Sequence, residues 1–234
     1  MPLPIEVLAL RLSLPPHSFY LLCRMSLYLL NERLWFPPVE EAMEDGLLAI
    51  GGDVSPERLH LAYQNGIFPW YNEDLPLWWS PDPRFVLFPH ELKIHKSMRS
   101  VLRKASFRWT INQAFSEVLD SCSSLPRNNQ EGTWLNNELM DSLIDLHQSG
   151  IAHSVEVWQD DQLVGGLYGI KIGKVFCGES MFSAVSNASK FGFLHFVEKL
   201  QSEGIELIDC QVYSDHLASL GARMIDRKEF MQYL

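Results

Sequence analysis

The first half of the chain combines short apolar stretches with proline and glycine, a pattern typical of a small mixed domain. Ser55 and Pro56 suit the N-cap and first turn of a helix that runs to about residue 65, where Gly66 ends it. Two aromatic, proline-rich stretches, 67–71 and 77–84, predict ordered loops or edge strands. The other elements predicted here are a basic helix at 95–104, a strand at 107–111, and helices at 112–121 and near 136–149.

The second half predicts a different arrangement, in which strands come first and a helix follows. Apolar and polar residues alternate from Ala152 to Trp158, and the pair Asp160–Asp161 predicts the turn of a hairpin. The later predicted elements are strands at 163–170, 174–177 and 206–212, and helices at 188–202 and near 215–220. We therefore expect an α+β fold: a small amino-terminal α/β domain and a carboxyl-terminal GNAT (acetyltransferase-like) domain.

The amino-terminal end does not fit either domain. Four prolines and two arginines interrupt the apolar runs of residues 1–24, so none reaches the roughly 20 apolar residues of a membrane span. A signal peptide is a weaker alternative, because no clear basic region or cleavage site is present. We expect residues 1–24 to be a non-native or disordered extension, followed by domains at 25–125 and 126–234.

Composition restricts the function classes. With 47% apolar and 21% charged residues, the chain has the composition of an ordinary globular protein. Its net charge of −10 argues against wrapping by nucleic acid, although a local basic patch remains compatible with it. The four cysteines lack the spacing of a zinc site, and no phosphate-binding glycine motif or serine nucleophile elbow is present. We therefore expect no zinc site.

Three polar residues lie in otherwise apolar predicted strands. Glu179 belongs to the segment 175–183, and Asp209 and Gln211 lie two positions apart in 207–212. Two residues so spaced on a regular strand share a face. A buried carboxylate needs a partner or a task, so these groups are either a structural polar pair or a site that holds an amine. The apolar residues around them form either plain core or a pocket for a substrate side chain. These residues are Leu167, Met181, Phe193, Phe196 and Ile208.

Positive charge is concentrated between residues 93 and 108, which contain six of the 19 Lys and Arg residues and no acid. On a helix, Lys96, Arg99 and Arg103 share one face. The usual explanation is a solvated helix face, and the functional alternative is contact with phosphate. Single-stranded nucleic-acid ends also need aromatic stacking surfaces, and the candidates are Trp70, Trp78, Trp79 and Trp134. We explain His153 and His216 as structural residues.

Seven motifs in order resemble the leucyl/phenylalanyl-tRNA–protein transferases over roughly residues 34–233. The motifs are GLLAIGGD (46–53), GIFPW (66–70), WSPDPR (79–84), EGTW (131–134), FCGESMFS (176–183), NASK (187–190) and DCQ (209–211). The resemblance implies a bacterial cytoplasmic enzyme that moves Leu or Phe from aminoacyl-tRNA onto proteins beginning with Arg or Lys. It also implies that the product is marked for degradation, and that no metal or cofactor takes part.

The resemblance also implies roles for individual residues. It assigns Asp209 and Gln211 to the catalytic pair and places Glu179 in the same site. The implied substrate-binding residues are Leu167, Met181, Phe193, Phe196, Ile208, Trp70, Trp134 and Tyr63. The implied tRNA-binding residues are Lys93, Lys96, Arg99, Arg103 and Lys104. Leu167 stands where Met is familiar, which leaves open the preference among Leu, Phe and Met. The alternatives are a transferase with another carrier or acceptor and a non-catalytic RNA-binding module.

Overall fold

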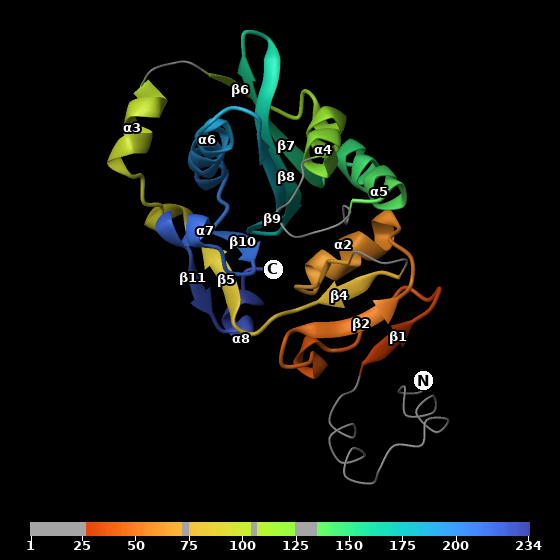
Figure 1. The fold of residues 1–234 in the computed structure, drawn as a ribbon. Helices are drawn as coiled ribbons and strands as arrows, with labels where there is room; N and C mark the ends of the chain where they lie inside the picture. The colour runs from red at the N-terminus through yellow and green to blue at the C-terminus, as the bar shows by residue number, and fades with distance from the viewer. Residues whose placement is uncertain (1–26, 72–74, 104–106, 125–134) are drawn as a thin grey trace, which may run out of the picture. The chain divides into compact units, whose positions relative to one another are not determined.

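The computed structural model describes residues 27–71, 75–103, 107–124 and 135–234. The predicted extension 1–24 therefore lies outside the described residues. Contacts divide the chain into two units, one ending at Asp82 and the other beginning at Pro83, and each is described by itself (Figure 1). Both units combine strands and helices, so the fold is mixed α/β. No helix in the described ranges is long and apolar enough to cross a membrane.

The amino-terminal unit contains a four-stranded sheet in the order β1-β2-β4-β3. Its strands are β1 (Tyr28–Leu30), β2 (Leu47–Gly51), β3 (Phe68–Pro69) and β4 (Leu77–Trp79); a 3-10 helix, η3, spans Val39–Glu41. The predicted helix is present as α2 (Pro56–Gln64), and the Ser55 side chain caps it by accepting from the Arg58 N–H. Gly66, just after the helix, has a φ of +68°, a conformation that glycine adopts without strain.

The carboxyl-terminal unit is built on a seven-stranded sheet in the order β11-β5-β10-β9-β8-β7-β6. The strands are β5 (Arg84–Leu87), β6 (Arg108–Ile111), β7 (Ala152–Gln159), β8 (Gln162–Ile172), β9 (Val175–Ser183), β10 (Leu207–Gln211) and β11 (Arg223–Ile225). The helices are η4 (Pro89–Glu91), α3 (Lys96–Arg103), α4 (Phe115–Ser124), α5 (Asn137–Gln148), α6 (Ala188–Ser202), α7 (Asp215–Ser219) and α8 (Arg227–Phe230). Strand β10 runs parallel to β9, and the other neighbours in the sheet are antiparallel.

Helices cover both faces of the sheet, with α6 on one face and α4 and α5 on the other (Figure 1). The pair Gly165–Gly166 on β8 allows this close approach from both sides. A Cβ at Gly165 would lie 2.7 Å from Cβ of Ala188 on α6. One at Gly166 would lie 2.7 Å from the Val155 carbonyl oxygen on β7 and 3.2 Å from Val118 on α4. Gly165 therefore serves helix packing, and Gly166 serves packing against both the neighbouring strand and α4.

The predicted hairpin is confirmed as β7 and β8. Asp160 and Asp161 between the strands have φ values of 48° and 59°, the left-handed conformation that a tight two-residue hairpin turn requires. The predicted helix at 188–202 is confirmed as α6 with the same bounds. Its inner face forms the main core with β8, β9 and β10, and the core residues include Leu167, Phe176, Phe193, Phe196, Leu200 and Ile208.

Two features of residues 83–234 differ from what the sequence predicts. Strands β5 and β11 were not predicted, and the two units meet between Asp82 and Pro83 rather than at the predicted boundary of 125/126. The reason is pairing with distant segments: β5 lies between β10 and β11, and β6 pairs with β7. Residues 83–124 thus contribute two strands to the large sheet.

Candidate active site

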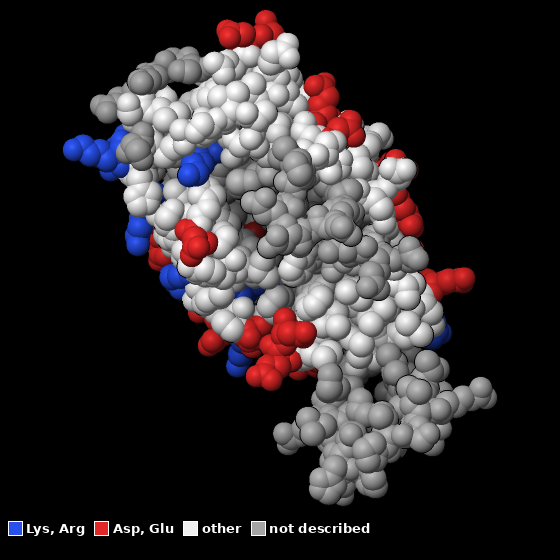
Figure 2. Space-filling model, in the orientation of Figure 1, with Lys and Arg blue, Asp and Glu red and all other residues white. Residues whose placement is uncertain are grey.

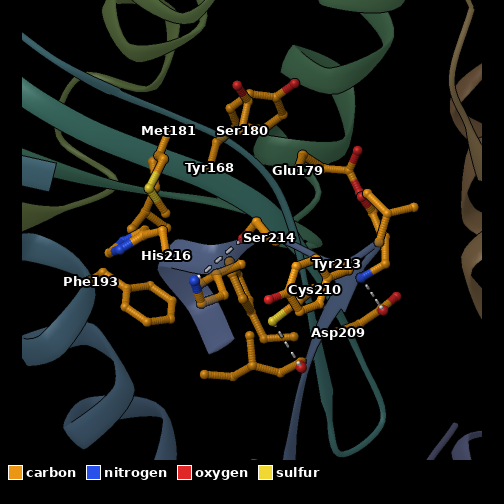
Figure 3. A pocket seen from close by; sticks show the side chains of 17 residues that line it. Tyr168, Glu179, Ser180, Met181, Phe193, Asp209, Cys210, Tyr213, Ser214 and His216 are labelled. Atoms are coloured by element: carbon orange, nitrogen blue, oxygen red, sulfur yellow. Dashed lines mark hydrogen bonds between the residues drawn. The ribbon is translucent and has the colours of Figure 1, made fainter. Parts of the chain in front are cut away.

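A pocket of about 420 Å³ is lined by residues of β8, β9, β10, α6 and α7 (Figure 3). Apolar side chains form much of its wall, and polar groups lie among them. The apolar lining residues include Leu167, Phe176, Met181, Phe193, Ile208 and Leu217, and the polar ones include Glu179, Ser180, Asp209, Gln211, Tyr213, Ser214 and His216. A pocket of this composition suits a ligand with an apolar side chain and a few hydrogen-bonding atoms.

Gln211 and Glu179 are joined by a hydrogen bond at this pocket. The Gln211 amide Nε2 donates to the Glu179 carboxylate Oε1 at 2.7 Å. Because the amide nitrogen is used in this way, the amide oxygen of Gln211 is the atom that can accept a hydrogen bond from a ligand. The backbone of Gln211 is left-handed, with a φ of +63°, at the end of β10 where the pairing with β5 shifts register. Such a conformation in a residue other than glycine is strained, by roughly 1–3 kcal/mol.

Asp209 is fully buried and forms a two-pronged ion pair with Arg84 of β5, which is 1% exposed. Arg84 Nε lies 2.8 Å from Asp209 Oδ1, and its second donor lies 2.7 Å from Oδ2. Asp209 Oδ1 also accepts from the backbone N–H of Gln211 at 2.9 Å. The Arg84 guanidinium lies over the Phe230 ring, 4.7 Å from its centroid. The buried carboxylate therefore has a partner.

This geometry corrects the predicted strand at 206–212. Regular alternation would place Asp209 and Gln211 on one face, but the register shift and the left-handed Gln211 break the alternation between them. As a result the two side chains have different surroundings. Asp209 is enclosed against Arg84, whereas Gln211 is half-buried beside Glu179.

The pKa values show how this charge arrangement affects its neighbours. Burial alone would lower the pKa of Arg84, but the charge of Asp209 and the hydrogen bonds to it outweigh burial and raise that pKa. Burial, followed by the charges of Asp209 and Glu179, raises the pKa of the Cys177 thiol well above its usual value. Burial and then the Asp209 charge also raise the pKa of Cys210. Both thiols stay protonated at neutral pH, so neither is a reactive nucleophile.

Four of the five predicted pocket residues line this pocket together with Glu179, Asp209 and Gln211; they are Leu167, Met181, Phe193 and Ile208. Phe196, the fifth, packs edge-on against Phe176 with ring centroids 4.9 Å apart. It lines a second cavity of about 320 Å³ with Ile111 and Leu200 instead. Phe196 supports the pocket wall through Phe176.

The predicted stacking residues of the amino-terminal unit differ from one another in exposure. Trp70 is 39% exposed, whereas Tyr63 is 2% exposed and belongs to the core of its unit. Trp78 is fully buried and donates from its indole to the Gly51 carbonyl at 2.8 Å, so the prediction that it stacks on a base is wrong. Trp79 is half-buried, and its indole donates to the Trp70 carbonyl at 2.7 Å. Trp134 lies outside the described residues.

The predicted basic helix is confirmed as α3. Lys96 and Arg99 are exposed on it, and Lys93 is exposed just before it. Figure 2 shows basic side chains gathered over α3 as Figure 1 places it. Arg103 ends this helix, but its side chain is outside the description, as is the whole of Lys104.

Two residues at the site were missed by sequence reasoning. Arg84 had a usable signal, because a charge directly before the apolar run 85–88 needs a buried partner. His216, explained above as structural, lines the pocket, and its Nε2 is buried with no hydrogen-bond partner among the described residues. Burial and then the charge of Lys190 lower the pKa of His216, which favours a neutral imidazole at neutral pH. Figure 3 shows it on the side where Met181 and Phe193 lie.

The site contains no grouping that would hold a metal ion. Within the described ranges, no three His, Cys, Asp or Glu side chains come together as metal ligands. The donor groups at the pocket are instead an amide, a carboxylate, hydroxyls and an imidazole. These groups can orient an amine and accept hydrogen bonds from it.

Comparisons with known proteins identify the chain. The family model described as leucyl/phenylalanyl-tRNA protein transferase matches residues 86–234, and the model of that family's N-terminal domain matches 52–82. A leucyl/phenylalanyl-tRNA–protein transferase from Flavobacterium johnsoniae is 59% identical over 209 residues, which cover 89% of this chain and 99% of the relative. One from Pseudomonas fluorescens is 52% identical over 213 residues, covering 90% and 94%.

Similarity to solved structures is much weaker. A GCN5-related N-acetyltransferase from Kribbella flavida is 9% identical, covers 70% of this chain and 59% of its own, and gives a TM-score of 0.37. A similarity at this level supports no conclusion about fold or activity. The sequence comparisons, in contrast, span nearly the whole length of the relatives. The chain belongs to the leucyl/phenylalanyl-tRNA–protein transferase family.

Proposed function

We propose that this protein transfers Leu or Phe, with Met as a further candidate, from aminoacyl-tRNA to the α-amine of proteins that begin with Arg or Lys. The acceptor is thereby marked for degradation in the cytoplasm, and the carboxyl-terminal unit is an acetyltransferase-like domain. The observation that carries the proposal is the apolar pocket with the Gln211–Glu179 pair among its lining residues. Such a site holds an apolar side chain beside a group that can orient an attacking amine.

The aminoacyl ester is already activated, so the protein mainly has to position an amine against its carbonyl. In our mechanism the acceptor α-amine attacks the ester carbon while the Gln211 amide oxygen accepts a hydrogen bond from it. The new bond is C–N, the broken bond is the ester C–O, and the ribose oxygen leaves as a hydroxyl. Glutamine is too weak a base to remove the proton fully, so a substrate hydroxyl or water completes the transfer.

Asp209 acts in this mechanism as a positioning residue. Its oxygens are already bonded to Arg84 and to the Gln211 backbone N–H, which supports an indirect role. By holding that N–H, Asp209 fixes the left-handed turn that presents the Gln211 amide. Glu179 holds the other end of the same amide. This replaces the simpler idea that Asp209 contacts the amine itself.

The donor substrate needs two further binding surfaces. We assign the aminoacyl side chain to the wall formed by Leu167, Met181, Phe193 and Ile208, with Phe196 behind it. We assign the terminal adenosine to Trp70 and Trp134, and the acceptor stem to Lys93, Lys96, Arg99, Arg103 and Lys104. Tyr63 is 2% exposed and is therefore not available for stacking on a base. Exposed Lys and Arg side chains on α3 support phosphate contact, because each one neutralised by a phosphate releases bound counterions.

The experiment is a transfer assay with Phe-tRNA or Leu-tRNA and a peptide beginning with Arg. We expect the peptide to gain one residue, as mass spectrometry would show, and a matched peptide beginning with Asp to remain unchanged. Uncharged tRNA with free Phe is the control for carrier dependence. Extension from another activated carrier but not from tRNA would favour the alternative transferase, and no extension from either would remove the proposal.

A further inference from the structure

Large apolar side chains are exposed at one place on the described part of the carboxyl-terminal unit. Val212, Tyr213 and Met224 are 45%, 57% and 44% exposed, and the other large apolar residues with such exposure belong to the amino-terminal unit. We call these three residues the rim patch. Val212 and Tyr213 also line the pocket. The rim patch is therefore continuous with the candidate active site.

Phe85 connects two members of the rim patch, Tyr213 and Met224. Met224 on β11 is its direct cross-strand partner, and directly opposed residues in an antiparallel pair share a face. Tyr213 also contacts Phe85, with ring centroids 5.2 Å apart. Gln211 is also paired with Phe85 across β10 and β5. Phe85 itself is 1% exposed, so it connects the exposed Tyr213 and Met224 to the Gln211 position from beneath the surface.

A carboxylate stands beside this surface. The Tyr213 hydroxyl donates to Asp215 Oδ1 at 2.8 Å, and Asp215 is exposed at the start of α7. Among the ion pairs of the described residues, none involves Asp215. Asp209, which lines the pocket, differs in this respect because it is paired with Arg84. Figure 2 shows an acidic group over the position that α7 occupies in Figure 1.

We propose that the rim patch and Asp215 bind the amino-terminal segment of the acceptor protein. Asp215 holds the cationic side chain of its first residue, and the rim patch holds the residue that follows. This inference rests on the proposed function, which places an α-amine at Gln211 and a cationic side chain next to it. Pocket-lining residues run without a break from Ile208 to Ser214, so Asp215 directly follows the pocket wall.

Charge favours a peptide over RNA on this surface. Tyr213 could stack on a base, but the Asp215 carboxylate beside it repels phosphate and attracts Arg or Lys. The basic helix α3 offers the opposite charge for tRNA. The two substrates then approach surfaces of opposite sign.

The test compares peptides that begin with Arg and with citrulline, which has the same shape but no charge. We expect Asp215→Asn to lower kcat/KM for the Arg peptide by about 1.5- to five-fold, the range for an exposed ion pair. It should leave the citrulline peptide and the KM for Phe-tRNA unchanged. Asp141→Asn, which removes an exposed acid on α5, is the matched control and should have no effect. Met224→Gln should raise the KM for a peptide with an apolar second residue more than for one with glycine there.

Three results would overturn the inference in distinguishable ways. If Asp215→Asn leaves the ratio of kcat/KM for the Arg peptide to kcat/KM for the citrulline peptide unchanged, Asp215 takes no part in acceptor recognition. A change in the KM for Phe-tRNA alone would show that the surface binds RNA. A wild-type protein that extends no peptide would remove the proposed function and this inference with it.

Discussion

Replacing Arg84 with Met is the most direct perturbation of the buried ion pair. Methionine retains much of the side-chain volume but leaves the Asp209 carboxylate, which is fully buried, without its cation. The substitution also removes the guanidinium from the Phe230 ring. We expect the carboxyl-terminal unit to become markedly less stable.

The size of the effect follows from the burial of both partners. Removing one member of a buried pair costs about 3–5 kcal/mol, because the other charge stays in a poorly solvated site. Domains of this size are stable by about 5–15 kcal/mol in total, so the loss is a substantial fraction. With a shift of about 2–4 °C per kcal/mol, the unfolding midpoint should fall by roughly 6–20 °C.

The assay is calorimetric and urea-induced unfolding of wild type, Arg84→Met, Asp209→Leu and the double variant. Because two units are present, the transition of the carboxyl-terminal unit has to be followed separately. The double variant should be more stable than Arg84→Met alone, since it buries no charge. It should still transfer slowly, because the Gln211 N–H has lost its acceptor. A loss below 1 kcal/mol in Arg84→Met, or additive losses in the double variant, would show that the buried Asp209 carboxylate does not depend on Arg84.

Three further predictions concern activity and pH. Gln211→Ala should slow transfer at saturating Phe-tRNA by about five- to a hundred-fold, as the loss of a hydrogen bond worth about 1–3 kcal/mol implies, with an unchanged KM for tRNA; a normal rate would remove the amide from the mechanism. Lys96→Glu combined with Arg99→Glu should weaken tRNA binding and reduce the slope of log K against log salt by about two, as a filter-binding titration would show. Burial acts to raise the pKa of Asp53, but hydrogen bonds from Arg58 and Ser55 lower it to about 2. Because the pKa is lower in the folded state, the stability lost in Asp53→Asn should be full above about pH 4 and disappear as the pH falls towards 2; a difference that is constant with pH in urea unfolding would contradict this.

Local signals in the sequence were enough for the elements that local interactions determine. The serine cap and proline of α2, and the aspartates of the β7–β8 turn, act within a few residues of their own position. The long helix α6 was also predicted with its correct bounds. Strands β5 and β11 are short, and pairing with distant segments defines them. Nothing within 84–87 indicates that its partner is 207–211.

The candidate site was predicted in composition but not in geometry. Glu179, Asp209 and Gln211 do lie together, yet the bulge between Asp209 and Gln211 gives them different neighbours. No glycine or asparagine marks the left-handed position at Gln211, so strand alternation was the reasonable expectation there. Periodicity could not separate Phe196 from the pocket residues, because a core residue and a pocket residue occupy the same face of α6.

The ion pair of Arg84 and Asp209 is better explained by its effect on the Gln211 backbone than by a contribution to stability. Well-packed apolar residues at the same place are often neutral or more stable by about 1–4 kcal/mol, so a buried pair alone adds little. What apolar residues cannot supply is the acceptor for the Gln211 N–H, which holds a backbone conformation that is itself strained. The connection therefore runs from Arg84 through Asp209 to Gln211, and from the Gln211 amide to Glu179. In the proposed mechanism, this fully buried charge directs the reaction at the pocket without contacting either substrate.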